Sequence, residues 1–414
     1  MKRLSPNFIF LLFFILFPLP VLSQEKFPIV AWWLTPNKNF PKDQKIKDIK
    51  DCGFNTILYY DEGIPSADSV CKLAAKCDLD IILGSYKLKS DKAQLYINAL
   101  SGCKNIVGWY LKDEPLFKDL PTLKSEYDNL SIYARQKSIY VNLIGCRSDK
   151  YTGPCPTMGE YLDTIEKLFH PKIWSFDYYP VSVDKGKIKV QYNQFFKSLK
   201  AFHDKSVQTG MPFWSFCETV EYKRKEIERP AATLPFLRFE AFSALAFGAK
   251  GIVYWSYELT KSKKGDFISA LIDSTGMKTP AWSHAQQVNR EISTFGDIFI
   301  NANINRIYIP NKGLLSSQLN AHFCLPINSL LDVKTNGKGV LVSDFSSNGV
   351  GYVLILNLDI ENFQSVQANF DQKFQYHQLE YQGPNEYSKK RLPPLKFRSI
   401  IPPGSYIILS YIPT

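Results

Sequence analysis

The chain has 414 residues, enough for one large domain and one smaller domain, and 45% of them are hydrophobic, as in folded globular proteins. Its formal net charge is +11, but basic residues are interspersed with acidic ones and form no long basic run, which argues against nucleic-acid binding. The eight cysteines include no C-x-x-C pair, so neither a zinc ribbon nor a thioredoxin-type site is supported.

Residues 1–23 have the pattern of a secretory signal peptide: a basic start, an apolar stretch over Phe8–Leu22 and small residues before Gln24. No later apolar stretch is long enough to span a bilayer, so we expect a secreted or periplasmic protein with no membrane contact after cleavage. An uncleaved anchor is the competing interpretation. In an oxidising compartment, Cys146 and Cys155 could pair and close a short loop.

Residues 24–298 repeat one unit eight times: a short β-branched or aromatic run, a polar loop and an amphipathic stretch. The runs begin 25 to 40 residues apart, at Pro28, Phe54, Leu79, Asn105, Ser138, Lys172, Met211 and Gly251. Helical spacing of apolar residues follows most of them, at Asp43–Cys52, Ser66–Cys77, Leu120–Gln136, Thr157–Phe169, Tyr192–Lys205, Leu234–Phe247 and Trp282–Phe295. This alternation predicts an α/β fold, a (β/α)8 TIM barrel. An open doubly wound sheet is the alternative, although no Gly-rich nucleotide-binding fingerprint follows the first strand.

The sequence pattern changes after residue 298, where short β-type runs are separated by turn residues such as Asn336-Gly337 and Pro402-Pro403-Gly404. We therefore expect residues 299–414 to form a small all-β sandwich domain. The runs are Asn305–Ile309, Val340–Phe345, Val350–Leu358, Ser365–Phe370, Phe374–Tyr381 and Ser405–Tyr411. The boundary between barrel and sandwich should lie near residue 298.

In a barrel of this kind, the catalytic and substrate-binding residues lie at the carboxyl ends of the strands. These predicted strand ends are rich in carboxylates and aromatic rings, and none of the five histidines lies at one of them. Metal-dependent barrel hydrolases and Ser-His-Asp hydrolases both need histidine, so neither class fits. Chemistry by two carboxylic acids remains, and glycoside hydrolysis is the reaction class that needs such a pair.

The fourth strand ends in the sequence GWYLKDEP, residues 108–115, which carries adjacent acids before a proline. Proline cannot donate to a strand ladder, so the strand should end at Asp113 and Glu114. The alternative is structural: Asp113 could cap the helix that follows Pro115. Asp61 and Glu62, after the second strand, either contact substrate or are solvated loop acids.

With one Glu ending strand four and another ending strand seven, the chain resembles the retaining β-glycosidases of glycoside hydrolase clan A. KDEP is similar to the clan's Asn-Glu-Pro motif, with Asp113 in place of the usual Asn. The resemblance implies that Glu114 is the general acid/base and Glu218 the nucleophile. It also implies that Tyr178 hydrogen-bonds the nucleophile and that Trp255 forms the platform under the sugar.

Further substrate-binding candidates come from the remaining strand ends: Asp113, Asn142, Trp33, Tyr60, Asp177 and Trp214. Asp113 would accept a hydrogen bond from a sugar hydroxyl where the clan's Asn donates one. The segments that begin at Leu237 and Ser274 are also similar to the closing barrel segments of β-galactosidase-like families. No individual family is assigned by these short motifs.

We therefore expect an exported retaining glycoside hydrolase that cleaves β-glycosidic bonds in an oligo- or polysaccharide. One alternative is a catalytically silent barrel that binds glycans. Another is a hydrolase specific for acidic glycans, in which Lys87, Arg147 or Lys223 would recognise carboxylate or sulfate groups. Neither a metal nor an organic cofactor is implied, and the sandwich would brace the barrel or bind polysaccharide.

Overall fold

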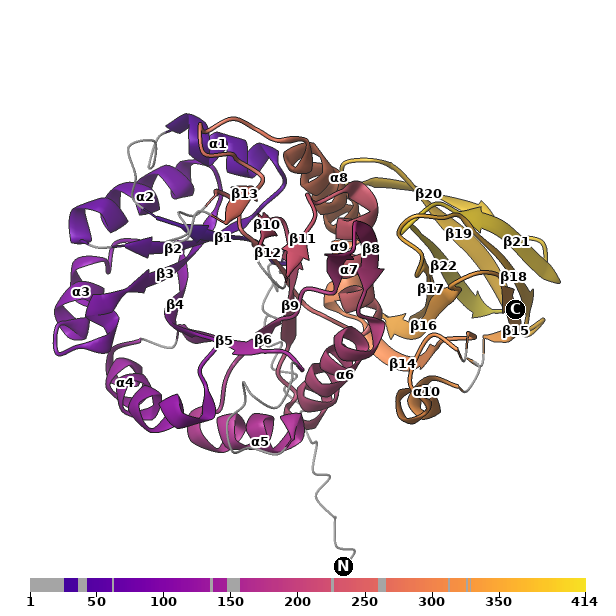
Figure 1. Cartoon of the computed structure of the whole chain (residues 1–414), viewed down its shortest axis with the longest axis horizontal. Coiled ribbons are helices and arrows are strands. Elements are labelled where there is room, and N and C mark those ends of the chain that lie inside the picture. Colours follow the sequence, from indigo (N-terminus) through magenta and orange to yellow (C-terminus); the bar gives the residue numbers. More distant parts are fainter. Residues whose placement is uncertain are drawn as a thin grey trace, which may run out of the picture.

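The computed structural model describes residues 26–35, 43–61, 63–134, 137–146, 157–224, 227–259, 266–311, 313–324, 327 and 329–414. Eight parallel strands close into a barrel in the order β1-β12-β9-β6-β5-β4-β3-β2, and helices surround it (Figure 1). An all-β region follows on one side of the barrel. The predicted fold class is confirmed. The predicted signal peptide lies outside the described residues, as do Glu62, Arg147 and Cys155.

Each barrel strand falls within one of the eight predicted runs. The strands are β1 (Ile29–Leu34), β2 (Thr56–Asp61), β3 (Asp80–Ser85), β4 (Ile106–Asp113), β5 (Ser138–Ile144), β6 (Trp174–Asp177), β9 (Phe213–Glu218) and β12 (Ile252–Trp255). The helices of the barrel are α1 (Asp43–Asp51), α2 (Ile64–Lys76), α3 (Ala93–Ala99), α4 (Leu120–Tyr133), α5 (Met158–Phe169), α6 (Tyr192–Thr209), α7 (Leu234–Ala246) and α8 (Pro280–Thr294). Two 3₁₀ turns, η1 (Tyr86–Lys89) and η2 (Phe117–Asp119), follow β3 and β4.

Burial on both faces explains why these strands read as nearly continuous apolar runs. All six residues of β9 are buried, for example. Inside the barrel, the Trp32 ring packs edge-on against Tyr110 and Phe216, with ring centroids 5.3 and 4.9 Å away. The barrel interior is thus a packed aromatic core whose upper layer can serve as the floor of a site.

A second, five-stranded sheet is built from segments that follow β6, β9 and β12. Its order is β13-β10-β11-β7-β8. The strands are β7 (Val181–Asp184), β8 (Lys187–Val190), β10 (Glu221–Lys223), β11 (Glu228–Arg229) and β13 (Phe267–Ser269). Because these segments leave the carboxyl ends of barrel strands, the sheet stands over that face of the barrel. We call it the cover sheet; the sequence patterns did not predict it.

The C-terminal region contains a six-stranded sheet, β14-β16-β17-β22-β19-β20, and a three-stranded sheet, β15-β18-β21. The short helix α9 (Gly296–Ile300) spans the predicted boundary, and α10 (Ser317–Phe323) lies between β14 and β15. The strands are β14 (Asn303–Tyr308), β15 (Leu330–Thr335), β16 (Val340–Ser347), β17 (Val350–Asn357), β18 (Gln364–Phe370), β19 (Phe374–Gly383), β20 (Glu386–Arg391), β21 (Lys396–Ile401) and β22 (Tyr406–Pro413). The predicted sandwich is therefore present, with three strands (β15, β20 and β21) that the sequence analysis missed.

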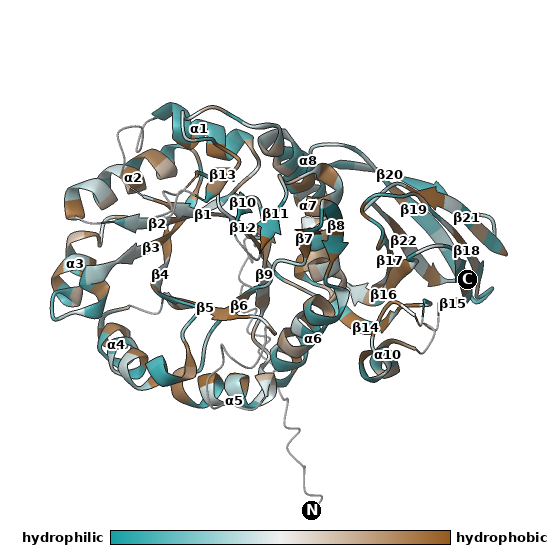
Figure 2. Ribbon diagram, viewed as in Figure 1, coloured by the Kyte–Doolittle hydropathy of each residue, from teal (hydrophilic) through white to brown (hydrophobic). Residues whose placement is uncertain are grey.

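The six-stranded sheet is buried on both faces. On one face, Val342 and Val353 pack toward the three-stranded sheet. On the other, Leu341 and Leu354 belong to the same core as the barrel helices. Figure 2 shows hydrophobic residues along these strands and hydrophilic residues on much of the outward side of the helices. In the described part of the chain, no helix is both long and apolar enough to cross a membrane.

Candidate active site

A cavity of about 560 Å³ opens at the carboxyl ends of the barrel strands, beneath the cover sheet. Barrel residues form its floor and one wall, and cover-sheet residues form the other. Those from the barrel and its loops are Trp32, Asp113, Glu114, Asn142, Asp177, Tyr178, Tyr179, Gln191, Gln194, Phe216 and Trp255. Those from the cover sheet and its turns are Tyr222, Arg224, Ile227, Arg229 and Phe267. Several residues proposed from the sequence therefore meet at one cavity.

Glu114 follows the last residue of β4 and lines the cavity. Its φ of +39° lies in the left-handed region, which a residue with a side chain rarely adopts. The Glu114 amide donates to the carbonyl of Asn142 on β5 at 2.9 Å, which fixes this turn of the chain. Backbone strain of this kind is common at active sites, where the surrounding structure holds a side chain in a required position.

Asn142 connects the carboxylates of Asp113 and Asp177. Its Nδ2 donates to Asp113 at 3.0 Å and to Asp177 at 3.2 Å. Its own carbonyl accepts from the Ser175 hydroxyl at 2.9 Å, which fixes the orientation of the amide. Asp113 is exposed, unlike the other three residues of this network, so its carboxylate is accessible from the cavity. The acid that replaces the clan's Asn is thus held by a neighbouring amide.

Glu218 is the last residue of β9 and is buried. Its Oε2 lies 3.6 Å from Nε of Arg229, which comes from the cover sheet and lines the cavity. Its backbone amide donates to Oε2 of Glu240, on α7, at 2.8 Å. Next to it in register is Trp255, the last residue of β12. The position of Glu218 is therefore determined from three directions.

Burial and neighbouring charges shift the pKa values of the ionisable groups around Glu218. Burial raises the pKa of Glu240 well above its usual range, and the Glu218 carboxylate raises it further. Burial alone would lower the pKa of Arg229, but Glu218 and Tyr222 raise it, and the net shift is upward. This keeps Arg229 a cation beside Glu218 and favours the neutral form of Glu240.

Aromatic rings surround the cavity on the side of Glu218. Trp255 stacks on Tyr179 with centroids 5.3 Å apart and meets Tyr222 and Phe267 edge-on at 6.3 and 5.7 Å. Burial, and then the Glu218 charge, raise the pKa of Tyr222, so its hydroxyl remains neutral and available for hydrogen bonding. Such apolar surfaces beside a few polar groups suit a sugar ring, whose faces are apolar and whose edges carry hydroxyls.

Of the other proposed residues, Tyr178 lies at this cavity, Trp33 and Tyr60 lie outside it, and Trp214 lines a separate cavity. Tyr178 lines the cavity, and its hydroxyl donates to Gln191 at 2.6 Å. Trp33 and Tyr60 stack on each other with centroids 5.1 Å apart at the ends of β1 and β2, outside the set that lines the cavity.

Trp214 does not join this site. It lies at the start of β9 and lines a separate cavity at the amino ends of the barrel strands, with Tyr140 and Gly108. Because Trp214 is the second residue of β9 and Glu218 the last, the two lie at opposite ends of the barrel. Asp61 is not a solvated loop acid: it is buried and accepts from the Gly63 amide and the Tyr96 hydroxyl.

The sequence analysis missed Arg229, Glu240 and Tyr222. Glu240 had a usable signal, since it interrupts the apolar helix sequence FEAFSALA, and a carboxyl group is almost never fully buried unless it is paired. Arg229 and Tyr222 lie on strands of two and three residues, too short for any periodic pattern. No group of three or more His, Cys, Asp or Glu residues suited to holding a metal occurs within the described ranges.

This arrangement defines a barrel whose cavity is lined by three carboxylates, two arginines and aromatic surfaces, with Glu218 buried beside Arg229. No family model matches the sequence, and no curated protein matches it. Among solved structures, a β-galactosidase from Bacillus circulans sp. alkalophilus superposes with a TM-score of 0.62 at 9% identity, over 94% of this chain and 99% of that one. A catalytic mutant of a GH42 β-galactosidase from G. stearothermophilus gives a TM-score of 0.60 at 9% identity, over 94% and 98%. The chain therefore shares its fold with these glycosidases, as the resemblance to clan A implied.

Proposed function

We propose that the protein is an exported retaining glycoside hydrolase that cleaves β-glycosidic bonds. One observation carries the proposal: Glu114 lines the barrel cavity, and Glu218 ends β9 beside two residues that line the same cavity, Arg229 and Trp255, in a fold shared with two β-galactosidases. The signal-peptide pattern of residues 1–23 supports export. The neighbours favour a β-galactoside as the first substrate to examine.

In the proposed mechanism, Glu114 protonates the glycosidic oxygen while the Glu218 carboxylate attacks the anomeric carbon. The bond to the leaving group breaks as an ester forms between the sugar and Glu218. Glu114, now a carboxylate, removes a proton from water, and the water oxygen displaces Glu218 from the anomeric carbon. Retention requires the two carboxyl groups to lie about 5–5.5 Å apart, which leaves no room for a water molecule between them in the first step.

The neighbouring residues support these two roles. Arg229 favours the ionised form of Glu218, which a nucleophile requires. The Glu240 carboxyl and the backbone of Glu218 hold the end of β9 in place. Trp255 offers an aromatic face, and Asp113, held by Asn142, would accept a hydrogen bond from a sugar hydroxyl.

The test is a screen of aryl β-glycosides, with aryl β-galactosides first, on the purified mature protein. Glu114→Gln and Glu218→Gln should each lower kcat by at least about a thousandfold while the protein remains folded. Azide should restore activity to Glu114→Ala and Glu218→Ala. The glycosyl azides formed by the two variants should have opposite anomeric configurations, which NMR distinguishes. Glycan binding without turnover by the wild-type protein would instead identify a catalytically silent barrel.

One observation favours the acidic-glycan alternative. Arg224 and Arg229 both line the cavity, although Arg224 pairs with Asp266 and Arg229 with Glu218. Of the residues first proposed for this role, Lys223 pairs with Glu228 at 2.8 Å, and Arg147 lies outside the described residues. Faster turnover of an aryl β-glucuronide or a sulfated galactoside than of the neutral glycoside would select this alternative.

A further inference from the structure

The three-stranded sheet of the C-terminal region presents one face to the core and one face to solvent. Val333, Val366, Ala368 and Phe397 are buried against the six-stranded sheet. Because side chains alternate along a strand, the intervening residues of β15, β18 and β21 point outward. The outward face is therefore available to a partner, far from the barrel cavity (Figure 1).

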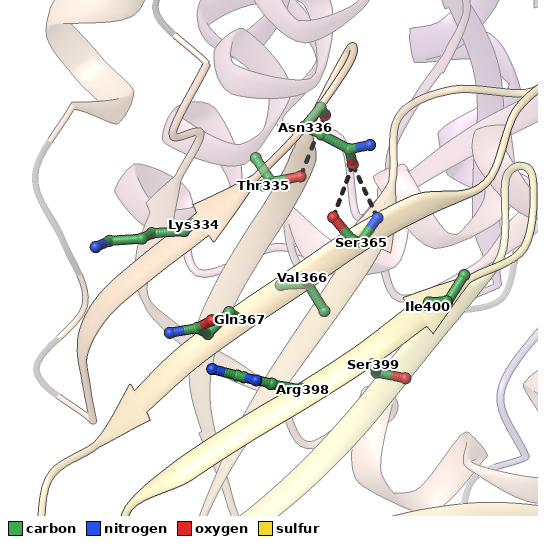
Figure 3. A pocket seen from close by; sticks show the side chains of 9 residues that line it. All are labelled: Lys334, Thr335, Asn336, Ser365, Val366, Gln367, Arg398, Ser399 and Ile400. Atoms are coloured by element: carbon green, nitrogen blue, oxygen red, sulfur yellow. Dashed lines mark hydrogen bonds between the residues drawn. The ribbon is translucent and has the colours of Figure 1, made fainter.

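Polar and basic side chains form a row across this outward face. Lys334 on β15 is opposite Gln367 on β18, and Gln367 is opposite Arg398 on β21. Figure 3 shows the nitrogen-bearing ends of these three side chains directed to the same side. Adjacent strands are about 4.8 Å apart, so the row spans about 10 Å from Lys334 to Arg398.

A parallel row lies one pair further along the strands. There, Asn369 on β18 is opposite Asp332 on β15 and Lys396 on β21. The two rows together carry three cations, two amides and one carboxylate. Asp332 lies 3.6 Å from Lys334, and both side chains are exposed. Within the described part of the chain, no ion pair involves Lys396 or Arg398, so the face carries a net positive charge.

The face is hollowed beside the first row, with a volume of about 530 Å³. Its rim is ordered: Asn336 Oδ1 accepts from the amide of Ser365 at 2.9 Å and from its hydroxyl at 3.1 Å (Figure 3). A second hollow shares Lys334, Thr335 and Asn336 with the first and continues past Asn311. These two hollows, which share one wall, are together called the groove.

We propose that this groove on β15, β18 and β21 binds an acidic polysaccharide through its carboxylate or sulfate groups. Lys334 and Arg398 would pair with successive anionic groups, and a guanidinium is suited to bidentate contact with either. The Gln367 amide and the hydroxyls around it would bond the hydroxyls of the sugar. No aromatic residue lines the first hollow, so base stacking, on which single-stranded nucleic-acid binding depends, has no counterpart here.

This binding site is independent of catalysis in the barrel. It would hold the protein on an anionic chain and raise the local concentration of glycan near the cavity. The test is affinity electrophoresis of the mature protein through gels that contain polygalacturonate, carrageenan or neutral galactan. The first two polymers separate carboxylate from sulfate recognition, and the third measures binding that does not depend on charge.

The decisive variant is Lys334→Gln with Arg398→Gln, and its matched control is Lys76→Gln with Lys104→Gln. The control removes the same charge from exposed positions on the barrel. We expect an acidic polymer to retard the wild type and the control equally, and the decisive variant at least tenfold more weakly. Added salt should weaken the wild-type interaction.

Three results would overturn the proposal. Equal loss in both double variants would mean that only the overall charge matters, and retardation by neutral galactan alone would remove the role of the cations. Binding to phosphatidylglycerol vesicles, together with no retardation by either acidic polymer, would assign the groove to a membrane surface. Activity on aryl glycosides is measured in parallel; its absence would affect the proposed hydrolase and leave this result intact.

Discussion

Glu218 lies between a cation and a second carboxyl group, and these two neighbours have opposite effects on its charge. Arg229 favours the anion by direct pairing. Glu240 would disfavour it if both acids were ionised, because like charges in a buried site repel. Burial resolves the conflict by favouring the neutral form of Glu240, whose Oε2 still accepts the Glu218 amide.

Glu240→Gln should change how stability depends on pH. The folded-state pKa of Glu240 is raised, so the folded protein retains a proton that the unfolded chain loses above its ordinary value of about 4.3. Wild-type stability is therefore penalised as pH rises above that value, by up to about 1.4 kcal/mol per pH unit until the folded pKa is reached. Gln is neutral and keeps an acceptor, so the stability of the variant relative to wild type should increase as the pH rises above about 4.3. Urea unfolding at several pH values measures this, and a constant difference would contradict it.

Arg229→Leu should shift the acid limb of the pH–rate profile. Without the guanidinium, the pKa of the Glu218 carboxyl should rise, so a higher pH would be needed to ionise the nucleophile. We expect the limb of kcat/KM to move up by about one pH unit and the plateau to fall at least tenfold. Lys223→Gln is the control, because Lys223 is exposed on the neighbouring strand β10 and pairs with Glu228. An unmoved limb in Arg229→Leu would show that the pair is only structural.

At the scale of single residues, the sequence predicted the positions that depend on the barrel strands themselves. Glu114, Asp177 and Glu218 were found because a strand end is recognisable from its apolar run. Arg229 was not, because its contact with Glu218 depends on how two loop strands fold over the barrel. Trp214 was assigned to the site as a residue near the end of strand seven, but it is the second residue of β9 and lies at the opposite end of the barrel from Glu218.

At the scale of elements, length and burial separate the strands that could be predicted from those that could not. The barrel strands are four to eight residues long and mostly buried, which gives a clear apolar run. In the C-terminal region, β20 has the sequence EYSKKR and is exposed at a sheet edge. Lysine-rich edge strands protect a sheet from pairing with other chains, but their sequences resemble loops.

Gly84, in β3, shows how one strand residue controls the aromatic packing beside the cavity. A Cβ at this position would lie 2.6 Å from the Tyr60 ring and 2.8 Å from the Tyr110 ring. Gly84→Ala should therefore push Tyr60 away from Trp33 and lower the free energy of unfolding by about 1–3 kcal/mol. Urea unfolding followed by tryptophan fluorescence reports both effects.

The matched control is Gly383→Ala, at the end of β19, where a Cβ would meet nothing within 4 Å. It changes the same atoms in a strand without the contact, so it should cost much less than the Gly84 substitution. If the two variants were equally destabilised, the loss would come from strand glycine in general rather than from the two tyrosine rings.

At the scale of the whole molecule, the barrel and the sandwich share one core. Phe242 on α7 stacks on Tyr406 of β22 with centroids 3.6 Å apart, and the Ser343 hydroxyl donates to the carbonyl of Ala246 at 2.6 Å. Arg238 pairs with Glu291 between α7 and α8, and the Tyr406 hydroxyl also donates to Glu291. This interface supports α7, the helix that carries Glu240. It is formed by the six-stranded sheet, whereas the proposed groove lies on the three-stranded sheet.

Gly404 is a position where this interface has no room for a side chain. A Cβ there would lie 2.1 Å from the carbonyl oxygen of Pro235 at the start of α7, and the φ of Gly404 is +59°. Gly404→Ala should therefore displace the sandwich from α7 and lower the free energy of unfolding by about 3 kcal/mol or more. Gly349→Ala separates the causes, since Gly349 also has a positive φ, +79°, but has nothing within 4 Å of a Cβ. That control should cost only the left-handed backbone penalty of about 1–2 kcal/mol.

Because α7 carries Glu240, the Gly404 variant should also lose activity below its melting temperature. Full activity with reduced stability would show that the sandwich stabilises the barrel without positioning its site.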